Sequence, residues 1–594
     1  MATPLPIAPP PGVILTESKR AARGRYVSSD GVRWVNGNAQ KNGGNVRAVT
    51  TPTSGQPRIA HAWRDNQADN FIAVGTFHKL YVYDTGFVQN DVTPFRITGT
   101  FGTNPFTPTN GSPNISVLLT AHGANPGDIF IIAGATTTGG LNLNGTWTVL
   151  TVTDSNNFVF VAGGNANSST PGGGASATYE FEITIGTENP AFGLGYGVGG
   201  YGIGTYGSAH SNSTVAIEAR VWSLDHFGKF LVATFNGGTV YQFDPTQLQP
   251  WPRAIMVDAS APTDCRALFV TPERFVFALR DAMVVAWCSQ GDFTTWTPAS
   301  SNTANTRTLT EGTKLVGGRV LGPYVSLVWT DAACYVFQYA GNQYVYQSSL
   351  AAKDCGLIGP NAVVTVGGIA YWQGTDTFWM FNGTVAVMAN VEDIRKYVYD
   401  ALDQTYGYAC TATYIPKYNE IRFCYVVVGE QVPTLTVVYS IDQQRWWPLG
   451  EGRHAGTHFT QGDTRPYIGA TDFFLYQHEN GFDNNGTPIS WNVLIAPAEL
   501  DSAQTNMHIE GIRFDFFELT GNVTATVNTY DELDSDTPTV LDTETEVVSG
   551  GGLQDFRLEG RFADLELSGS DLSQYFRLGI HTAYVKPAGQ RRRN

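Results

Sequence analysis

Residues 229–245 read KFLVATFNGGTVYQFDP. An apolar strand, a Gly237-Gly238 turn and an aromatic second strand predict a β-hairpin. Copies after Phe243 recur about every 40–60 residues, close to the length of a four-stranded propeller blade. The repeats predict an all-β chain with a β-propeller of about six to seven blades. The related hairpins are NFIAVGTFHKLYVYD (70–84), RFVFALRDAMVVAWCS (274–289), YVSLVWTDAACYVFQYAG (324–341), GIAYWQGTDTFWMFNG (368–383), EIRFCYVVVGEQVPTLTVVYSID (420–442) and RPYIGATDFFLYQHENG (465–481).

The composition agrees with many short strands. The chain has 594 residues, 65 of them glycine, with 12% aromatic and only 15% charged residues. This length predicts two to four domains. The formal net charge of −16 argues against a general nucleic-acid-binding surface, because phosphate contacts need clustered Lys and Arg.

Cysteine use and hydropathy exclude other classes of protein. The six cysteines form no C-x-x-C pair, so we expect buried core positions and no zinc or disulfide framework. The start, MATPLPIAPPPGV, does not match a secretory signal, and no apolar stretch is long enough to span a membrane. We therefore expect folding in a cytoplasm and no membrane insertion. The cysteines are Cys265, Cys288, Cys334, Cys355, Cys410 and Cys424.

Shifts in pattern divide the chain into five segments. The Pro-rich and then basic start predicts an extended arm that cannot pair within a sheet, and that either reaches a neighbouring subunit or is disordered. Strands bounded by Gly, Asn and Asp predict a small sandwich or barrel inserted in a blade loop, where extra length costs little entropy. The blade pattern stops near residue 500. The segments are 1–25 (extended arm), 26–94 (start of the propeller), 95–185 (inserted β module), 186–500 (propeller blades) and 501–594 (C-terminal β unit with the basic tail QRRRN).

A glycine–tyrosine run, GLGYGVGGYGIGTYG (193–207), marks the return from the inserted module to the propeller. It contains the glycine pattern of a nucleotide-binding loop, but no helix follows it, so we interpret it as a structural loop. Its tyrosines recur every five residues on a glycine backbone. We predict that the subunit contacts include Tyr196, Tyr201 and Tyr206 from this run and Arg23 and Arg25 from the arm.

One segment predicts a helix, NVEDIRKYVYDALDQTYG (390–407). Val391, Ile394, Val398 and Leu402 would share one face. Asn390 is a candidate N-cap and Gly407 a candidate terminator. The helix would pack against a blade or dock on a neighbouring chain.

No motif points to catalysis. His454 and His458 are four residues apart, but their surroundings indicate strand and loop instead of a metal-binding helix. The stretches DELDSDTP (531–538) and DNNGT (483–487) are typical of turns and lack the distant glutamate of an EF-hand. SQGDFTTW (289–296) has its glycine and aspartate in the wrong order for an Asp-box. There is no G-x-S-x-G elbow. We expect no catalytic residues, no cofactor, no metal site and no enzyme activity.

Three stretches together resemble the tail hub or nozzle proteins of short-tailed bacteriophages, often called packaged-DNA stabilisation proteins. The similarity lies in an Arg…Val-Arg…Asn-Gly…Gly-Gly pattern, in the glycine–tyrosine run with its following blade, and in two later blades. These motifs are structural and carry no catalytic residues. The stretches are GRYVSSDGVRWVNGNAQKNGG (24–44), YGVGGYGIGTYG with ARVWSLDHFGKFLVATFNGGTVYQFDP (219–245), and LVWTDAACYVFQYAG…CGLIGPNAVVTVGGIAYWQGTDTFWMFNGTV (327–385).

The resemblance implies a structural virion protein, made in the cytoplasm of the host bacterium and located in the tail. About six copies would form a ring below the portal and its head-to-tail adaptor protein. The ring would retain the packaged genome, let the double-stranded DNA leave, and hold tail fibres, spikes or a needle. Net negative charge suits a channel through which DNA slides, so we expect an acidic channel wall.

Two other interpretations remain open from the sequence. The chain is alternatively a receptor- or glycan-binding propeller, a fibre-like adhesin with or without hydrolase activity. In a third interpretation the core forms the nozzle, and the 95–185 module binds fibres or the adaptor.

Overall fold

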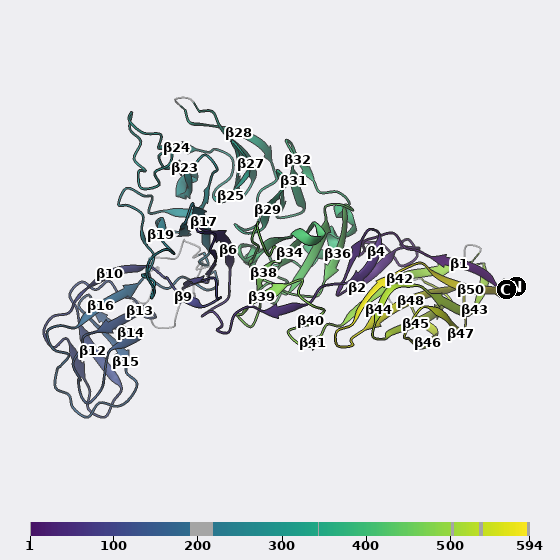
Figure 1. Cartoon of the computed structure of the whole chain (residues 1–594), viewed down its shortest axis with the longest axis horizontal. Coiled ribbons are helices and arrows are strands. Elements are labelled where there is room, and N and C mark those ends of the chain that lie inside the picture. Colours follow the sequence, from purple (N-terminus) through teal and green to yellow (C-terminus); the bar gives the residue numbers. More distant parts are fainter. Residues whose placement is uncertain (1, 191–217, 342–343, 501–503, 534–537, 591–594) are drawn as a thin grey trace, which may run out of the picture.

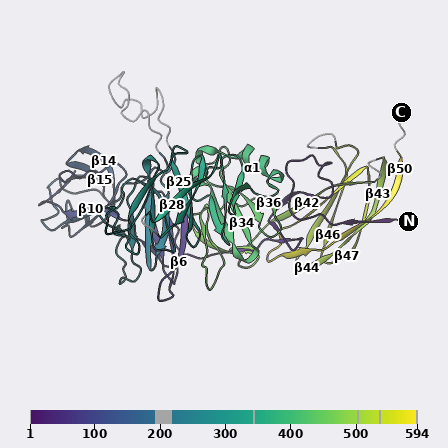
Figure 2. The same cartoon turned by 90° about the horizontal axis from the view of Figure 1, so that it is seen from above.

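The computed structural model describes residues 2–190, 218–341, 344–500, 504–533 and 538–590. The fold is almost entirely antiparallel β-sheet, as the sequence predicts. Three parts follow one another along the long axis in Figure 1: the inserted module, the propeller, and a β unit that holds both chain ends. Figure 2 shows the same order from above.

The propeller consists, within the described ranges, of seven sheets whose four core strands pair in order. The blades are β6 (Ile59–Arg64), β7 (Asn70–Gly75), β8 (Leu80–Tyr83), β9 (Gln89–Asp91); β17 (Trp222–Phe227), β18 (Phe230–Phe235), β19 (Tyr241–Phe243), β20 (Ile255–Met256); β21 (Cys265–Val270), β22 (Val276–Arg280), β23 (Val284–Trp287), β24 (Asn305–Thr308); β25 (Leu315–Gly322), β26 (Val325–Thr330), β27 (Ala333–Tyr339), β28 (Tyr346–Lys353); β29 (Val363–Val366), β30 (Ile369–Gln373), β31 (Phe378–Phe381), β32 (Val385–Val387); β33 (Thr411–Ile415), β34 (Glu420–Tyr425), β35 (Leu435–Ser440), β36 (Arg445–Leu449); and β37 (Gly456–Thr457), β38 (Tyr467–Gly469), β39 (Leu475–His478), β5 (Asn45–Arg47).

The first strands of these blades close a ring. Each touches the next in the order β6, β17, β21, β25, β29, β33, β37, and β37 touches β6 again. The last blade is completed by β5, which comes from the start of the chain and pairs with β39 through Asn45↔His478 and Arg47↔Tyr476. A hairpin of β40 (Asp483–Asn484) and β41 (Thr487–Pro488) continues this sheet. The propeller is therefore closed by strands from both ends of the sequence.

Packing between neighbouring blades places a large aromatic side chain against a small residue of the adjacent blade. Trp222 is fully buried between the first two blades, against Phe235 at a ring distance of 5.1 Å. Gly75 faces it, and a Cβ at Gly75 would lie 2.7 Å from the Trp222 Cβ. Only glycine leaves room there for the indole, so residue size sets the spacing of these blades.

The inserted module leaves the propeller after β9 and folds around its own core of phenylalanines. Strand β14 pairs with β13 in its first half and with β15 in its second, so two half-sheets face each other. Phe130 lies between them and contacts Phe158 at 5.2 Å and Phe181 at 5.2 Å. The strands are β10 (Phe95–Thr100), β11 (Phe106–Pro108), β12 (Asn114–Leu118), β13 (Ile129–Ala133), β14 (Gly145–Asp154), β15 (Asn157–Val161) and β16 (Thr178–Glu182).

Ion pairs anchor the module to the propeller. Lys79 donates to Glu182 Oε1 at 2.6 Å and to Asp91 at 2.8 Å. Arg253 reaches the same two carboxylates. Strand β10 pairs with β16, so the two ends of the module lie side by side at the blade edge.

The N-terminal residues correct the expected domain boundaries. Residues 26–41 were expected to begin the propeller, but β2 pairs with β42, and β4 pairs with β49. The Pro-rich arm also enters a sheet, because β1 is an edge strand beside β50, where Pro4 and Pro6 cost no interior ladder bond. The C-terminal unit thus begins with β42, before residue 501, and includes both chain ends. Its strands are β1 (Thr3–Ile7), β2 (Tyr26–Asp30), β3 (Val32–Val35), β4 (Asn38–Lys41), β42 (Trp491–Glu499), β43 (Thr505–Phe514), β44 (Phe516–Thr520), β45 (Val523–Tyr530), β46 (Val540–Val548), β47 (Gly552–Gly560), β48 (Phe562–Gly569), β49 (Tyr575–Leu578) and β50 (His581–Gln590).

The segment expected to be one helix is divided into short pieces. The predicted apolar face is buried, with Val398 fully covered. However, Leu402 is extended (φ −66°, ψ 126°) and bridges to Val427, because packing against the blade outweighs helix propensity. Asn390 occupies the N-cap position of η2, but its side chain makes no capping hydrogen bond and instead donates to the Gln444 carbonyl at 2.7 Å. The helical pieces of the described chain are η1 (Asp281–Met283), η2 (Val391–Asp393), α1 (Arg395–Ala401), η3 (Gln404–Ala409) and η4 (Pro416–Tyr418).

A buried ion network joins the C-terminal unit to the last two blades. Arg33 on β3 is fully buried and donates two hydrogen bonds to Glu479, at 2.9 and 2.5 Å. Glu479 also accepts from Arg422 on β34 at 2.9 Å. Glu420 lies 3.6 Å from Arg33, and burial raises the pKa of its carboxyl to about 7 although Arg33 and Arg422 oppose the shift.

The backbone beside this network requires glycine. A Cβ at Gly43 would overlap the Glu479 side chain, and one at Gly44 would lie 2.5 Å from the Asp483 nitrogen. The Val-Arg and Gly-Gly elements of the first family-like stretch therefore belong to a single contact, in which the chain passes directly over the buried carboxylate.

We predict that Arg33→Ala strongly destabilises the protein, because it leaves buried Glu479 with Arg422 alone and removes the ion pair of buried Glu420. Loss of one member of a buried pair costs about 3–5 kcal/mol. The midpoint of thermal unfolding, measured by calorimetry, should fall clearly. The matched control is Arg465→Ala, which removes an exposed pair with Asp463 and should cost about 0–1 kcal/mol. Equal effects of the two substitutions would contradict this role of Arg33.

Candidate functional site in the central channel

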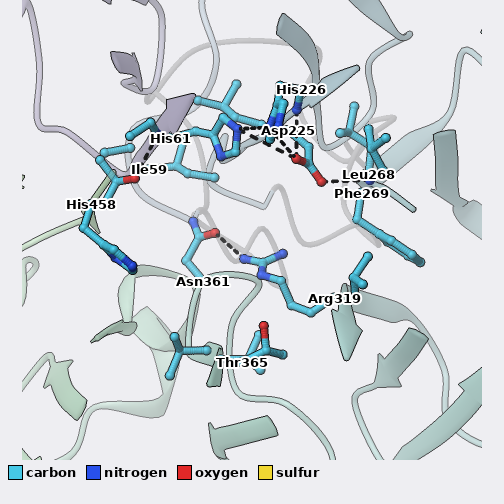
Figure 3. A pocket seen from close by; sticks show the side chains of 18 of the residues that line it. Ile59, His61, Asp225, His226, Leu268, Phe269, Arg319, Asn361, Thr365 and His458 are labelled. Carbon is cyan, nitrogen blue, oxygen red and sulfur yellow. Dashed lines mark hydrogen bonds and ion pairs between the residues drawn. The ribbon is translucent and has the colours of Figure 1, made fainter. Parts of the chain in front are cut away.

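The first strands of the blades enclose a cavity of about 620 Å³ on the propeller axis. Every blade contributes to its wall, which mixes small, threonine and histidine side chains. Figure 3 shows histidines and Asp225 on one side of this cavity, with Arg319 and Asn361 across from them. The channel thus collects polar groups from strands that are distant in the sequence.

Three residues from the first two blades meet at the wall. His61 on β6 places its Nε2 3.0 Å from the His226 Nδ1 on β17. The Asp225 Oδ1 lies 3.7 Å from His61 Nε2 and 3.4 Å from His226 Nδ1. These atoms form the one group of three His, Cys, Asp or Glu ligands with suitable spacing in the part of the chain that the structure describes.

Neighbouring atoms fix the charge state and orientation of this cluster. Asp225 accepts backbone hydrogen bonds from His226 N and from Val270 N, both at 2.8 Å. Burial opposes ionisation of Asp225, but the hydrogen bonds and the two histidines outweigh it and lower the pKa of the carboxyl. Burial lowers the pKa of His61 to about 4, with Asp225 opposing, so this imidazole is neutral at pH 7.

The opposite wall carries a fixed cation. Arg319 on β25 donates to the Gly318 carbonyl at 2.9 Å and to the Pro360 carbonyl at 3.2 Å. Burial lowers the pKa of its guanidinium, although Asp225 acts in the other direction. The carbonyl contacts hold Arg319 in place, so it faces the His61–Asp225–His226 cluster across the cavity (Figure 3).

The histidine pair considered in the sequence is separated in space. His454 is buried, and the Gln56 side-chain nitrogen lies 2.6 Å from its Nδ1. His458 instead lines the channel and packs against the Tyr414 ring at 5.7 Å. The two do not share a ligand site.

The structure gives different information on the predicted contact residues. Tyr196, Tyr201 and Tyr206 lie outside the described residues. Arg23 is exposed and pairs with Glu499 of its own chain at 2.7 Å. Arg25 is half-buried, and burial lowers the pKa of its guanidinium. Their role as subunit contacts stays a prediction.

Other expectations from the sequence concern cysteines and turns. The six cysteines are buried and free, which confirms their assignment to the core. In the 289–296 stretch, whose residue order departs from an Asp-box, Asp292 accepts from the Thr294 backbone nitrogen at 3.0 Å in a local turn. Within the described ranges, the longest helical pieces are too short and polar to cross a membrane.

Comparisons with known proteins add little to the geometry. No protein-family model matches the chain, and no curated protein sequence matches it. Among solved structures the chain is similar to BamB from Moraxella catarrhalis, with 10% identity over 43% of this chain and 80% of BamB. The TM-score is 0.25, a level at which the likeness carries no information on function.

The sequence does not reveal the His61–Asp225–His226 cluster because His61 lies 165 residues before His226 in the chain. The Asp225–His226 pair lies in a strand that also contains Ser223, so its polarity alone gives no local signal of a site. Only the closure of the ring shows that His61 is their neighbour.

We predict a pH-dependent loss of stability that involves His454. Burial lowers its pKa to about 3, whereas an unfolded histidine titrates near 6.5. Below pH 6.5 the unfolded state therefore binds a proton that the folded state excludes, and stability falls by about 1.4 kcal/mol per pH unit for each such group. The expected result is a smaller slope of unfolding free energy against pH, between pH 6 and 4.5, in His454→Gln than in wild type. An unchanged slope would show that His454 accepts a proton in the folded state.

Proposed function

We propose that this chain is a structural subunit of the tail hub or nozzle of a short-tailed bacteriophage, and that several copies form a ring below the portal and adaptor. The observation that carries the proposal is where the family-like stretches fall in the fold. The first forms β2–β4 and the buried Arg33 contact, and the third forms parts of two adjacent blades. The resemblance thus lies in residues that hold an architecture together.

The arrangement of modules suits such a ring. The propeller lies between an inserted module at one end and the C-terminal unit at the other, so a subunit offers two distant attachment regions (Figures 1 and 2). Near the two ends of the described chain, β1 and β50 pair with each other within the C-terminal unit.

The net negative charge of the chain favours a role in letting DNA pass over a role in binding it. Residues 501–594 contain 16 Asp or Glu and 8 Lys or Arg, which accounts for half of the net charge of −16. An acidic wall repels phosphates and lets a duplex slide. The unit also includes residues 1–41 and 491–500, which add three Asp or Glu and six Lys or Arg and bring its net charge to −5. We therefore assign only the acidic strands of residues 501–594 to the channel side of the proposed ring.

The decisive experiment is assembly. We expect the purified chain to form rings on portal–adaptor complexes, seen by negative-stain microscopy, and to keep DNA inside packaged heads that lack their own nozzle. An adhesin would instead bind polysaccharide as an isolated subunit and would not retain the genome. Polysaccharide binding without assembly would favour that alternative.

The role of the inserted module is testable by deletion. Because Thr98 pairs with Glu180 on adjacent strands, residues 99–179 can be replaced by Asn-Gly, which forms a tight hairpin turn. Phe181→Thr is added, since that ring belongs to the removed core, and Glu182 is retained for Lys79 and Arg253. We expect ring formation to persist and one partner, a fibre or the adaptor, to be lost. Failure of the deleted chain to fold would contradict an independent module.

A further inference from the structure

The central cavity of the propeller contains a group of ligand atoms. Neither catalysis nor assembly of the proposed ring requires these atoms. We propose that His61, Asp225 and His226 bind a divalent transition-metal ion, with Zn²⁺ the best fit, and that this ion fastens the first blade to the second. The inference is independent of the proposed tail function, because it rests only on the geometry of the channel.

The distances match a metal site. The three ligand atoms are separated by 3.0, 3.4 and 3.7 Å. A triangle with these sides has a circumscribed radius of about 2.0 Å, the length of a Zn–N or Zn–O bond. An ion just outside the plane of the three atoms would therefore reach all of them with little movement.

The surroundings hold the ligands in place, as partners of a metal site do. The other carboxylate oxygen of Asp225 accepts from Val270 N on the third blade, which directs Oδ1 toward the histidines. The His61 ring stacks on Trp63, with centroids 6.2 Å apart and planes at 17°. The two imidazole nitrogens, His61 Nε2 and His226 Nδ1, face each other at 3.0 Å beside the Asp225 carboxylate (Figure 3).

The ligand types favour zinc. Two imidazoles and one carboxylate are the nitrogen and oxygen donors of catalytic and open zinc sites, whereas calcium and magnesium prefer oxygen donors alone. The cavity leaves the fourth position open to water, and the fixed charge of Arg319 across it favours an anion or a hydroxide there.

The position of the site between the first two blades indicates that a bound ion would hold these blades together. Strands β6 and β17 are neighbours in the ring, but the inserted module separates β9 from β17 in the sequence. The first two blades therefore lack the short connection that links most other neighbouring blades. A metal bridge between His61 and the Asp225–His226 pair would close this seam from the channel side.

The test uses the full chain without a histidine tag, treated with EDTA and then titrated with Zn²⁺ or Co²⁺ at pH 7.5. We expect one ion per chain by elemental analysis, visible absorption typical of four-coordinate Co²⁺, and a rise of several degrees in the unfolding temperature. No stoichiometric binding by the wild-type chain would overturn the proposal and leave a hydrogen-bonded cluster without an ion.

Variants then assign the site. His61→Gln and His226→Asn should each weaken Zn²⁺ binding at least about tenfold and abolish the thermal shift. His458→Asn is the matched control, a channel histidine outside the cluster, and should bind as wild type does. Unfolding temperatures in EDTA show whether each variant still folds. Wild-type affinity in both cluster variants would place the ion elsewhere and refute the assignment.

Discussion

The contact between Arg33 and Glu479 is the constraint on which the arrangement of the chain depends. It brings together the strand β3 of the C-terminal unit and the last two blades of the propeller. Such a network offers less stability than apolar packing would, but it is highly intolerant of a missing partner. It therefore fixes where the two modules meet, while the adjacent apolar core, with Trp34 against Trp447 at 5.2 Å, supplies the buried area.

The same region shows what the sequence could predict. The repeated hairpins predicted the all-β propeller, because each blade is a local run of strands whose pattern repeats. They could not predict that β5 completes the last blade or that β2 joins β42, since pairings across more than 400 residues leave no local signal. The broken helix at 391–409 shows the same limit. The spacing of nearby apolar residues predicts its buried face, but the blade against which it packs determines where each helical piece ends.

The sequence predicted much less of the candidate site than of the fold. Neither His61 nor the Asp225–His226 pair is unusual in its own strand. Their proximity results from ring closure, which places first strands of successive blades side by side. By contrast, His454 and His458 are near in sequence and separate in space, because one faces the interior and the other the channel. In a propeller, spacing along the chain is a poor guide to shared chemistry.

The closing strand also sets an order for synthesis. Strand β5, at residues 45–47, cannot find its partner until β39, at residues 475–478, has left the ribosome. At 5–20 residues per second this interval lasts about 20–90 s. Until β39 appears the growing propeller is an open arc, and an unpaired blade edge is a ready template for pairing with another chain. The nascent protein is therefore most exposed to misassembly with its neighbours on the same messenger RNA just before β39 appears and the ring can close.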